Sequence, residues 1–136
     1  MTLPALSRIQ RFYAQQVHAV DAGDFTAYRD TFTETATFLL PGETEPVSGS
    51  QAISEHSEKH AARRNSQNIV QRHHVTMTGL HESAGGYLTA RSCTVIVATP
   101  LGGSAVITAA LECEDEFEER DGVLRIRRRR VTRNSP

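Results

Sequence analysis

The stretch EDEFEERDGVLRIRRRRV, residues 114–131, decides the fold of this chain. At its centre, Asp121-Gly122 favours a two-residue type I′ turn, because both central positions of that turn require a positive φ. The turn sets the register of the flanking strands, so that Arg120 faces Val123. One face then carries acids opposite arginines, in the pairs Glu118–Arg125, Glu116–Arg127 and Glu114–Arg129. The other face carries the pairs Phe117–Ile126, Asp115–Arg128 and Cys113–Arg130. We therefore expect a hairpin with its charged face in solvent and its apolar face in the domain.

A period of two continues upstream of this hairpin and predicts a series of antiparallel strands. Together with the hairpin, long strands are expected over 69–78, 87–99, 104–119 and 123–133. Gly85-Gly86 and Gly102-Gly103 lie at the joints, where tight turns need a positive φ. The second half of the chain is therefore predicted to form one antiparallel sheet.

The first half of the chain shows helical spacing instead. An apolar stripe of period 3.6 follows residues 5–21, at Leu6, Ile9, Phe12, Tyr13, Gln16, Val17 and Val20. Gly23 ends this helix, and the Asp24 carboxylate can cap a second short helix that runs through Phe32. A strand over 35–40, a loop over 41–50 and a third helix over 50–64 follow. Helices first and strands afterwards predict one α+β domain over 1–136, in which the helices pack on an antiparallel sheet.

Charge and composition narrow the classes of function. The chain has 15 Lys and Arg against 16 Asp and Glu, a net charge of -1, which favours neither nucleic acid nor an anionic membrane. The arginines at 127–130 face acids in the predicted hairpin, so they are interpreted as part of a strand. No stretch is apolar for long enough to form a membrane span or a signal peptide. Because Cys93 and Cys113 form no close-spaced pair, we expect a cytoplasmic protein without a disulfide framework.

Polar residues interrupt the predicted inner face at three places, where burial would cost free energy unless the group has a function or a partner. Alternation places His73 inward with Val75 and Met77, so it is either a proton-transfer group or a core histidine bonded to the backbone. Asp21 extends the stripe of the first helix, and either orients a histidine, acts as a base, or caps the turn. Asp115 opposes Arg128 and forms either a structural ion pair or a substrate anchor.

Two further patterns are weaker. His56 and His60 lie four residues apart on the inward stripe of the third helix, a spacing that can bind a metal ion from one helix face. No metalloprotease-type glutamate and no nearby cysteine accompany them, so we predict no metal site and interpret both as residues of a pocket rim. Cys113 faces inward within an acidic stretch that offers no base, which argues against a nucleophilic thiolate.

The sequence resembles the SnoaL-like branch of the nuclear-transport-factor-2-like superfamily over nearly its whole length. The resemblance rests on VDAGDF (20–25), TFTETATFLLPG (31–42), SGSQAI (48–53), QRHHVT (71–76), ARSCTVIV (90–97) and the stretch 114–131. It implies a cone-shaped half-barrel, with three N-terminal helices packed on the sheet around a deep apolar pocket, and commonly a homodimer. Relatives include polyketide cyclases, scytalone dehydratase, ketosteroid isomerase and the β subunits of ring-hydroxylating dioxygenases. The catalytic members move protons beside a carbonyl without metal or organic cofactor.

The resemblance also suggests roles for single residues. Asp21 and His73 match the acid and the histidine of scytalone dehydratase. This chain departs from that enzyme at its pocket tyrosines, second histidine and asparagine, where it has Val20, Leu40, Thr94 and Cys113. Scytalone is therefore not the expected substrate.

Two functions follow as hypotheses. In the first, the chain is an acid–base enzyme of secondary metabolism that cyclises, dehydrates or isomerises a polyketide-like or aromatic carbonyl substrate, with His73 moving the proton and Asp21 assisting. The predicted pocket-lining residues are Val17, Leu40, His56, His60, Val75, Ser92, Thr94, Cys113 and Asp115. In the alternative, the chain binds a small molecule without chemistry, or is a structural subunit resembling a dioxygenase β subunit. Neither hypothesis involves nucleic acid or a membrane.

Overall fold

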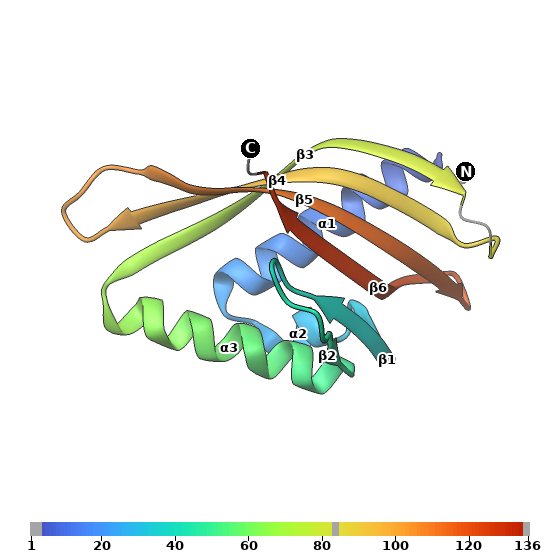
Figure 1. The fold of residues 1–136 in the computed structure, drawn as a ribbon, viewed down its shortest axis with the longest axis horizontal. Helices are drawn as coiled ribbons and strands as arrows, with labels where there is room; N and C mark the ends of the chain where they lie inside the picture. Colours follow the sequence, from blue (N-terminus) through green and yellow to red (C-terminus); the bar gives the residue numbers. More distant parts are fainter. Residues whose placement is uncertain (1–3, 83–84, 135–136) are drawn as a thin grey trace.

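The computed structural model describes residues 4–82 and 85–134. Its elements are α1 (Ala5–Ala22), α2 (Phe25–Arg29), β1 (Phe32–Leu39), β2 (Val47–Ser48), α3 (Ser50–Ser66), β3 (Ile69–Glu82), β4 (Leu88–Pro100), β5 (Val106–Arg120) and β6 (Val123–Arg133). The strands form one sheet in the order β2-β1-β6-β5-β4-β3. Neighbours are antiparallel except β1 and β6, which are parallel. The sheet curves, and the helices lie on one side of it (Figure 1). This confirms the predicted α+β half-barrel.

The helices begin and end close to the predicted positions. Gly23 adopts φ 79° at the C-terminus of α1, a conformation that suits glycine because it lacks a Cβ atom. The Asp24 carboxylate accepts a hydrogen bond from the Ala27 backbone N at 3.1 Å, which confirms the predicted cap. The predicted extension of α2 through Phe32 is wrong, because the Thr31 carbonyl accepts a hydrogen bond from Ile126 and Phe32 enters β1 beside β6. Pairing between β1 and β6 therefore outweighs the helical pattern of the sequence at Phe32.

The register of the last hairpin is correct as far as Ile126 and then shifts by one residue. Asp121 and Gly122 both have positive φ, as a type I′ turn requires, and Phe117 pairs with Ile126. Beyond a β-bulge, Asp115 pairs with Arg129 rather than Arg128. Likewise Cys113 pairs with Val131 rather than Arg130, and Glu114 with Arg130 rather than Arg129. The bulge lets Ile126 and Val131, five positions apart, both point inward, where they are 0% and 5% exposed.

A second bulge changes the inner face of β3. The register with β4 shifts between Thr76 and Gly79, and Met77 has φ 55°. Met77 is 83% exposed, so its predicted inward position beside His73 and Val75 is wrong. A one-residue irregularity moves a side chain to the opposite face, because side chains in a strand alternate with a period of two.

The packed core and the open part of the interior lie at different ends of the strands. Phe12 packs edge-to-face against Phe117, with ring centroids 5.0 Å apart. Ile9 and Ile126 complete this end of the core and are both 0% exposed. Leu6, which begins the predicted stripe, is 41% exposed instead. Across residues 4–82 and 85–134, no helix is long and apolar enough to cross a membrane.

Candidate functional site

An internal cavity of about 480 Å³ lies between the concave face of the sheet, α1 and α3. Its wall contains every residue predicted to contact substrate: Val17, Leu40, His56, His60, Val75, Ser92, Thr94, Cys113 and Asp115. These residues come from separate helices, strands and a loop, and the fold brings them together around one space. Their contact with a substrate stays a prediction.

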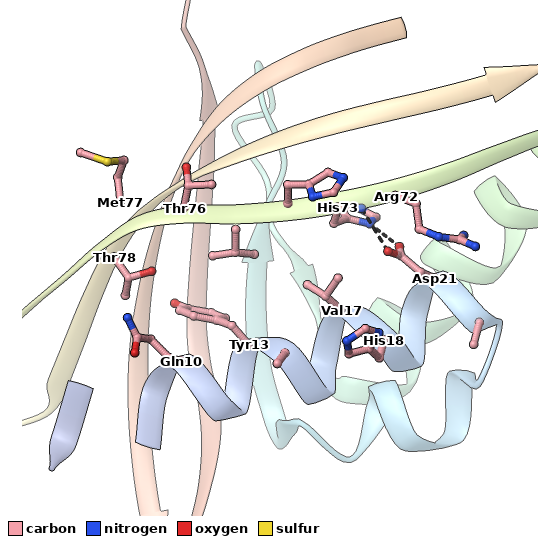
Figure 2. Close-up of a pocket in the computed structure, with 14 residues that line it drawn as sticks. Gln10, Tyr13, Val17, His18, Asp21, Arg72, His73, Thr76, Met77 and Thr78 are labelled. Carbon is pink, nitrogen blue, oxygen red and sulfur yellow. Dashed lines mark hydrogen bonds and ion pairs between the residues drawn. The ribbon is translucent and has the colours of Figure 1, made fainter. Parts of the chain in front are cut away.

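His73 lines this cavity, and its ring contacts the carboxylate of Asp21; Figure 2 shows the two residues joined by dashed lines. The Asp21 carboxylate accepts two hydrogen bonds from His73, at 2.6 Å from ring Nδ1 and at 3.0 Å from the backbone N. Both carboxylate oxygens are therefore used, and the side chain of Asp21 is only 9% exposed. Because Nδ1 donates its hydrogen to the carboxylate, Nε2 is the ring nitrogen that remains for other chemistry.

The geometry distinguishes the two members of this pair. His73 belongs to the cavity wall, whereas Asp21 does not. Both residues line a groove of about 640 Å³ between α1 and β3, which also contains Met77 and Thr78, so that of the pair only His73 borders the two spaces (Figure 2). Of the roles that the sequence left open for Asp21, the arrangement favours orienting the imidazole over acting directly on a ligand in the cavity. We place the candidate site in the cavity, since the groove includes the exposed side of the β3 bulge.

The cavity contains a buried ion pair of Asp115, one of the two roles expected for this residue, but its partner is Arg129, which the sequence did not predict. Asp115 is 0% exposed and accepts hydrogen bonds from Arg129 Nε at 2.7 Å, Arg129 Nη2 at 3.0 Å and the Tyr13 hydroxyl at 2.6 Å. Arg129 Nη2 also donates to Gln16 Oε1 at 2.7 Å. Burial opposes the charge on Arg129, but the Asp115 carboxylate outweighs it and raises the pKa of the guanidinium. Burial and the charge of Asp115 raise the pKa of Tyr13, so its hydroxyl stays protonated.

The predicted partner of Asp115, Arg128, is wrong because of the β6 bulge. One signal in the sequence could have revealed Arg129. Ile126 and Val131 are both apolar, but regular alternation would place their side chains on opposite faces of the strand. Both can point inward only if one irregular position lies between them. Beyond that position, Arg129 shares the inward face of Val131.

The β4 and β5 side of the cavity carries small polar groups. Ser92 is 2% exposed, and its Oγ has no hydrogen-bond partner among the residues described. The Thr94 hydroxyl lies 3.7 Å from Cys113 Sγ. Burial raises the pKa of Cys113, so the thiol form dominates at neutral pH. This environment agrees with the expectation that Cys113 is not a nucleophilic thiolate. A ligand oxygen bound here would satisfy the Ser92 hydroxyl.

His56 and His60 lie together on the α3 side of the cavity. Their rings are 4.5 Å apart, centroid to centroid. Within the described ranges, no group of three His, Cys, Asp or Glu side chains is placed to hold a metal ion, at these histidines or elsewhere. Burial, followed by the charges of His56, Arg63 and Arg64, lowers the pKa of His60.

The comparisons agree with this architecture. Among solved structures, Aln2 from a Streptomyces species has a TM-score of 0.86 at 27% identity, with 98% of this chain and 94% of that chain covered. A Catenulispora acidiphila protein in complex with S-DNPA has a TM-score of 0.83 at 26% identity, with coverages of 95% and 92%. An NTF2-like protein with a cystatin-like fold from Novosphingobium aromaticivorans has a TM-score of 0.78 at 19% identity, with coverages of 93% and 80%, and shows the fold alone.

The sequence comparisons give a family but no named relative. A search of the curated proteins found no match. The family model of the SnoaL-like domain matches residues 1–130, nearly the whole chain. With the half-barrel and its internal cavity, this match confirms the resemblance read from the sequence, and the chain belongs to the SnoaL-like domain family.

Proposed function

We propose that this SnoaL-like protein is an acid–base enzyme that acts without metal or organic cofactor on a polyketide-like or aromatic carbonyl compound. The reaction is a cyclisation, dehydration or isomerisation. The observation that carries the proposal is the pair of hydrogen bonds from His73 to Asp21 at the edge of a partly open cavity. A histidine fixed in this way presents one defined ring nitrogen to a ligand, which general acid–base catalysis requires.

In the proposed reaction, His73 Nε2 accepts a proton from the carbon next to the carbonyl group. Asp21 stabilises the resulting imidazolium through the 2.6 Å hydrogen bond to Nδ1. His73 then returns the proton to another carbon in an isomerisation, or to a departing hydroxyl group in a dehydration. Such proton transfer contributes roughly 10²–10⁴-fold to a rate.

The cavity wall supports a substrate of this class. Val17, Leu40 and Val75 provide apolar surface for a hydrocarbon skeleton. Ser92 and Thr94 provide hydroxyl groups for ligand oxygens. The related Catenulispora acidiphila protein, solved in complex with S-DNPA, supports a small-molecule ligand.

The alternative of a binding module without chemistry rested on the absence of pocket tyrosines, where this chain has Val20 and Leu40. The cavity nevertheless contains Tyr13 and Tyr28, which α1 and α2 supply from other positions. Burial raises the pKa of Tyr28, so its hydroxyl stays protonated and can donate a hydrogen bond. Homodimer formation remains a prediction from the resemblance, which light scattering would test.

The test is hydrogen–deuterium exchange at the carbon next to a carbonyl group, followed by proton NMR in D₂O with 1-tetralone and 2-tetralone. We expect the wild type to accelerate exchange, and His73→Gln to lose about 10²-fold or more of that acceleration. Asp21→Asn should lose less, because it alters the support of the imidazole without removing it. His74→Gln is the matched control, since His74 is the exposed neighbour and does not line the cavity. Equal rates in the wild type and His73→Gln would refute the assignment, and no acceleration by the wild type would favour the binding module.

A further inference from the structure

The cavity wall carries more positive than negative charge. Its arginines are Arg64, Arg129 and Arg133, and its only carboxylate among the described residues is Asp115. Asp115 neutralises Arg129, because the two form a buried pair with side chains 0% and 11% exposed. Arg64 and Arg133 are therefore left without a counter-charge in the wall.

Arg64 is the more informative of these two residues. It lies in the last turn of α3 and faces the cavity from the same side of the helix as His56 and His60, at intervals of four residues. No residue in the described part of the chain forms an ion pair or a hydrogen bond with its guanidinium. A partly buried charge without a partner is costly, and an anion in the cavity would offset that cost.

Arg64 also lies near the proposed catalytic pair. Burial lowers the pKa of Arg64, and the charge of Asp21 opposes that effect. The guanidinium is therefore within electrostatic reach of the carboxylate that holds His73. The lowered pKa of His60, to which His56, Arg63 and Arg64 contribute after burial, indicates a positive local field on this side of the cavity.

We propose that the cavity takes an organic anion, whose acidic group binds Arg64 at the α3 side while its hydrocarbon part lies against the apolar wall. The acidic group is a carboxylate or a sulfonate-like group, since a guanidinium binds both through paired N–H donors. The inference rests on the same cavity as the proposed function and narrows its substrates to carbonyl compounds that also carry an acidic group. Binding and turnover are separate measurements, so either idea can fail without the other.

Two fluorescent probes with nearly the same skeleton test the inference. 1-Anilinonaphthalene-8-sulfonate carries an acidic group, and N-phenyl-1-naphthylamine lacks it. We expect the wild type to bind the sulfonate more tightly than the neutral probe, and raised salt to reduce the difference. Arg64→Gln should weaken sulfonate binding by about 3- to 10-fold, the range for a charge-assisted contact near the surface, and leave the neutral probe unchanged.

Arg63→Gln is the matched control. It makes the same change of charge one residue away in the same helix turn, but Arg63 is exposed and does not line the cavity. A selective loss of sulfonate affinity in Arg64→Gln supports the proposal. Equal losses in both variants would overturn it, because they would show only the general field of the helix end. Unchanged affinity with a lower melting temperature in Arg64→Gln would also overturn it, because Arg64 would then serve only the α3 C-terminus.

Turnover separates this inference from the proposed function. His73→Gln with lost exchange activity and unchanged sulfonate affinity would support both ideas. Wild-type protein that binds the sulfonate through Arg64 but exchanges neither the tetralones nor a tetralone that carries a carboxylate would support the anion site and refute the enzyme.

Discussion

Removing the charge of Asp115 is expected to destabilise the domain more than any surface substitution. Asp115→Asn keeps the volume of the side chain but leaves Arg129 buried without a counter-charge. Asp115 is 0% exposed and accepts three hydrogen bonds, two from Arg129 and one from Tyr13. Breaking a buried pair by removing one partner costs about 3–5 kcal/mol. The reason is that the remaining charge has lost both water and its partner.

That loss is large beside the stability of the whole domain. At about 0.05–0.15 kcal/mol per residue, a chain of 136 residues has a free energy of unfolding of roughly 7–20 kcal/mol. With about 3–5 °C for each kcal/mol at this size, the melting temperature should fall by roughly 10–25 °C. Urea unfolding followed by circular dichroism should show a lower midpoint with an unchanged slope, provided that the transition stays two-state.

Two further variants make the reasoning refutable. Glu119→Gln removes an exposed ion pair with Arg8 and should leave the midpoint within error, since solvent screens that pair. The double variant Asp115→Leu with Arg129→Met should recover part of the lost stability, because an apolar pair avoids the desolvation cost of both charges. The recovery is incomplete because the buried Tyr13 hydroxyl and the Gln16 amide oxygen lose their hydrogen-bond partners. A loss below about 1 kcal/mol in Asp115→Asn, or a double variant as unstable as the single one, would show that the pair does not behave as a buried ion pair.

Three smaller effects are expected. Ser92→Ala should raise the free energy of unfolding of the ligand-free protein by about 1 kcal/mol in urea titrations, because it removes a buried hydroxyl without a partner; a lower value would contradict this. Iodoacetamide at neutral pH should label Cys93 and spare Cys113 in peptide mass spectra, since burial raises the pKa of Cys113; equal labelling would be inconsistent with that environment. Because the folded-state pKa of His60 lies below 6.5, the unfolded chain binds more protons at this residue, and the free energy of unfolding falls as the pH drops through 6.5. His60→Gln should reduce that fall in urea titrations at several pH values. An unchanged fall would assign the pH dependence to other groups.

The fold could be predicted from the sequence because its strongest patterns are local. The helical stripe around Ile9, the positive φ required at Gly23 and the Asp121-Gly122 turn each act over a few residues. The same holds for the inward direction of His73, which follows from alternation within one strand. Such patterns predict the structure correctly because they depend only on the neighbouring backbone.

The candidate site was predicted less completely, for a reason seen at the two bulges. Each bulge inserts one residue into a ladder and reverses every side chain beyond it, which moved Met77 out of the interior and Arg129 into it. The spacing of Ile126 and Val131 in the sequence indicates that an irregular position lies between them. The place of that extra residue, however, depends on how β6 pairs with β5. The buried ion pair therefore became visible only in three dimensions.

The sequence by itself determined the α+β class, the family, and part of the cavity wall. Only the tertiary structure decided that Asp21 bonds to His73, that Arg129 bonds to Asp115, and that Arg64 remains without a partner among the residues described. The two bonded pairs join residues 52 and 14 positions apart in the chain. Periodicity assigns a face to each side chain, but it carries no information on which distant side chain will share that face. That choice is made when the helices close over the curved sheet, because burial then requires each polar group to find a partner or a ligand.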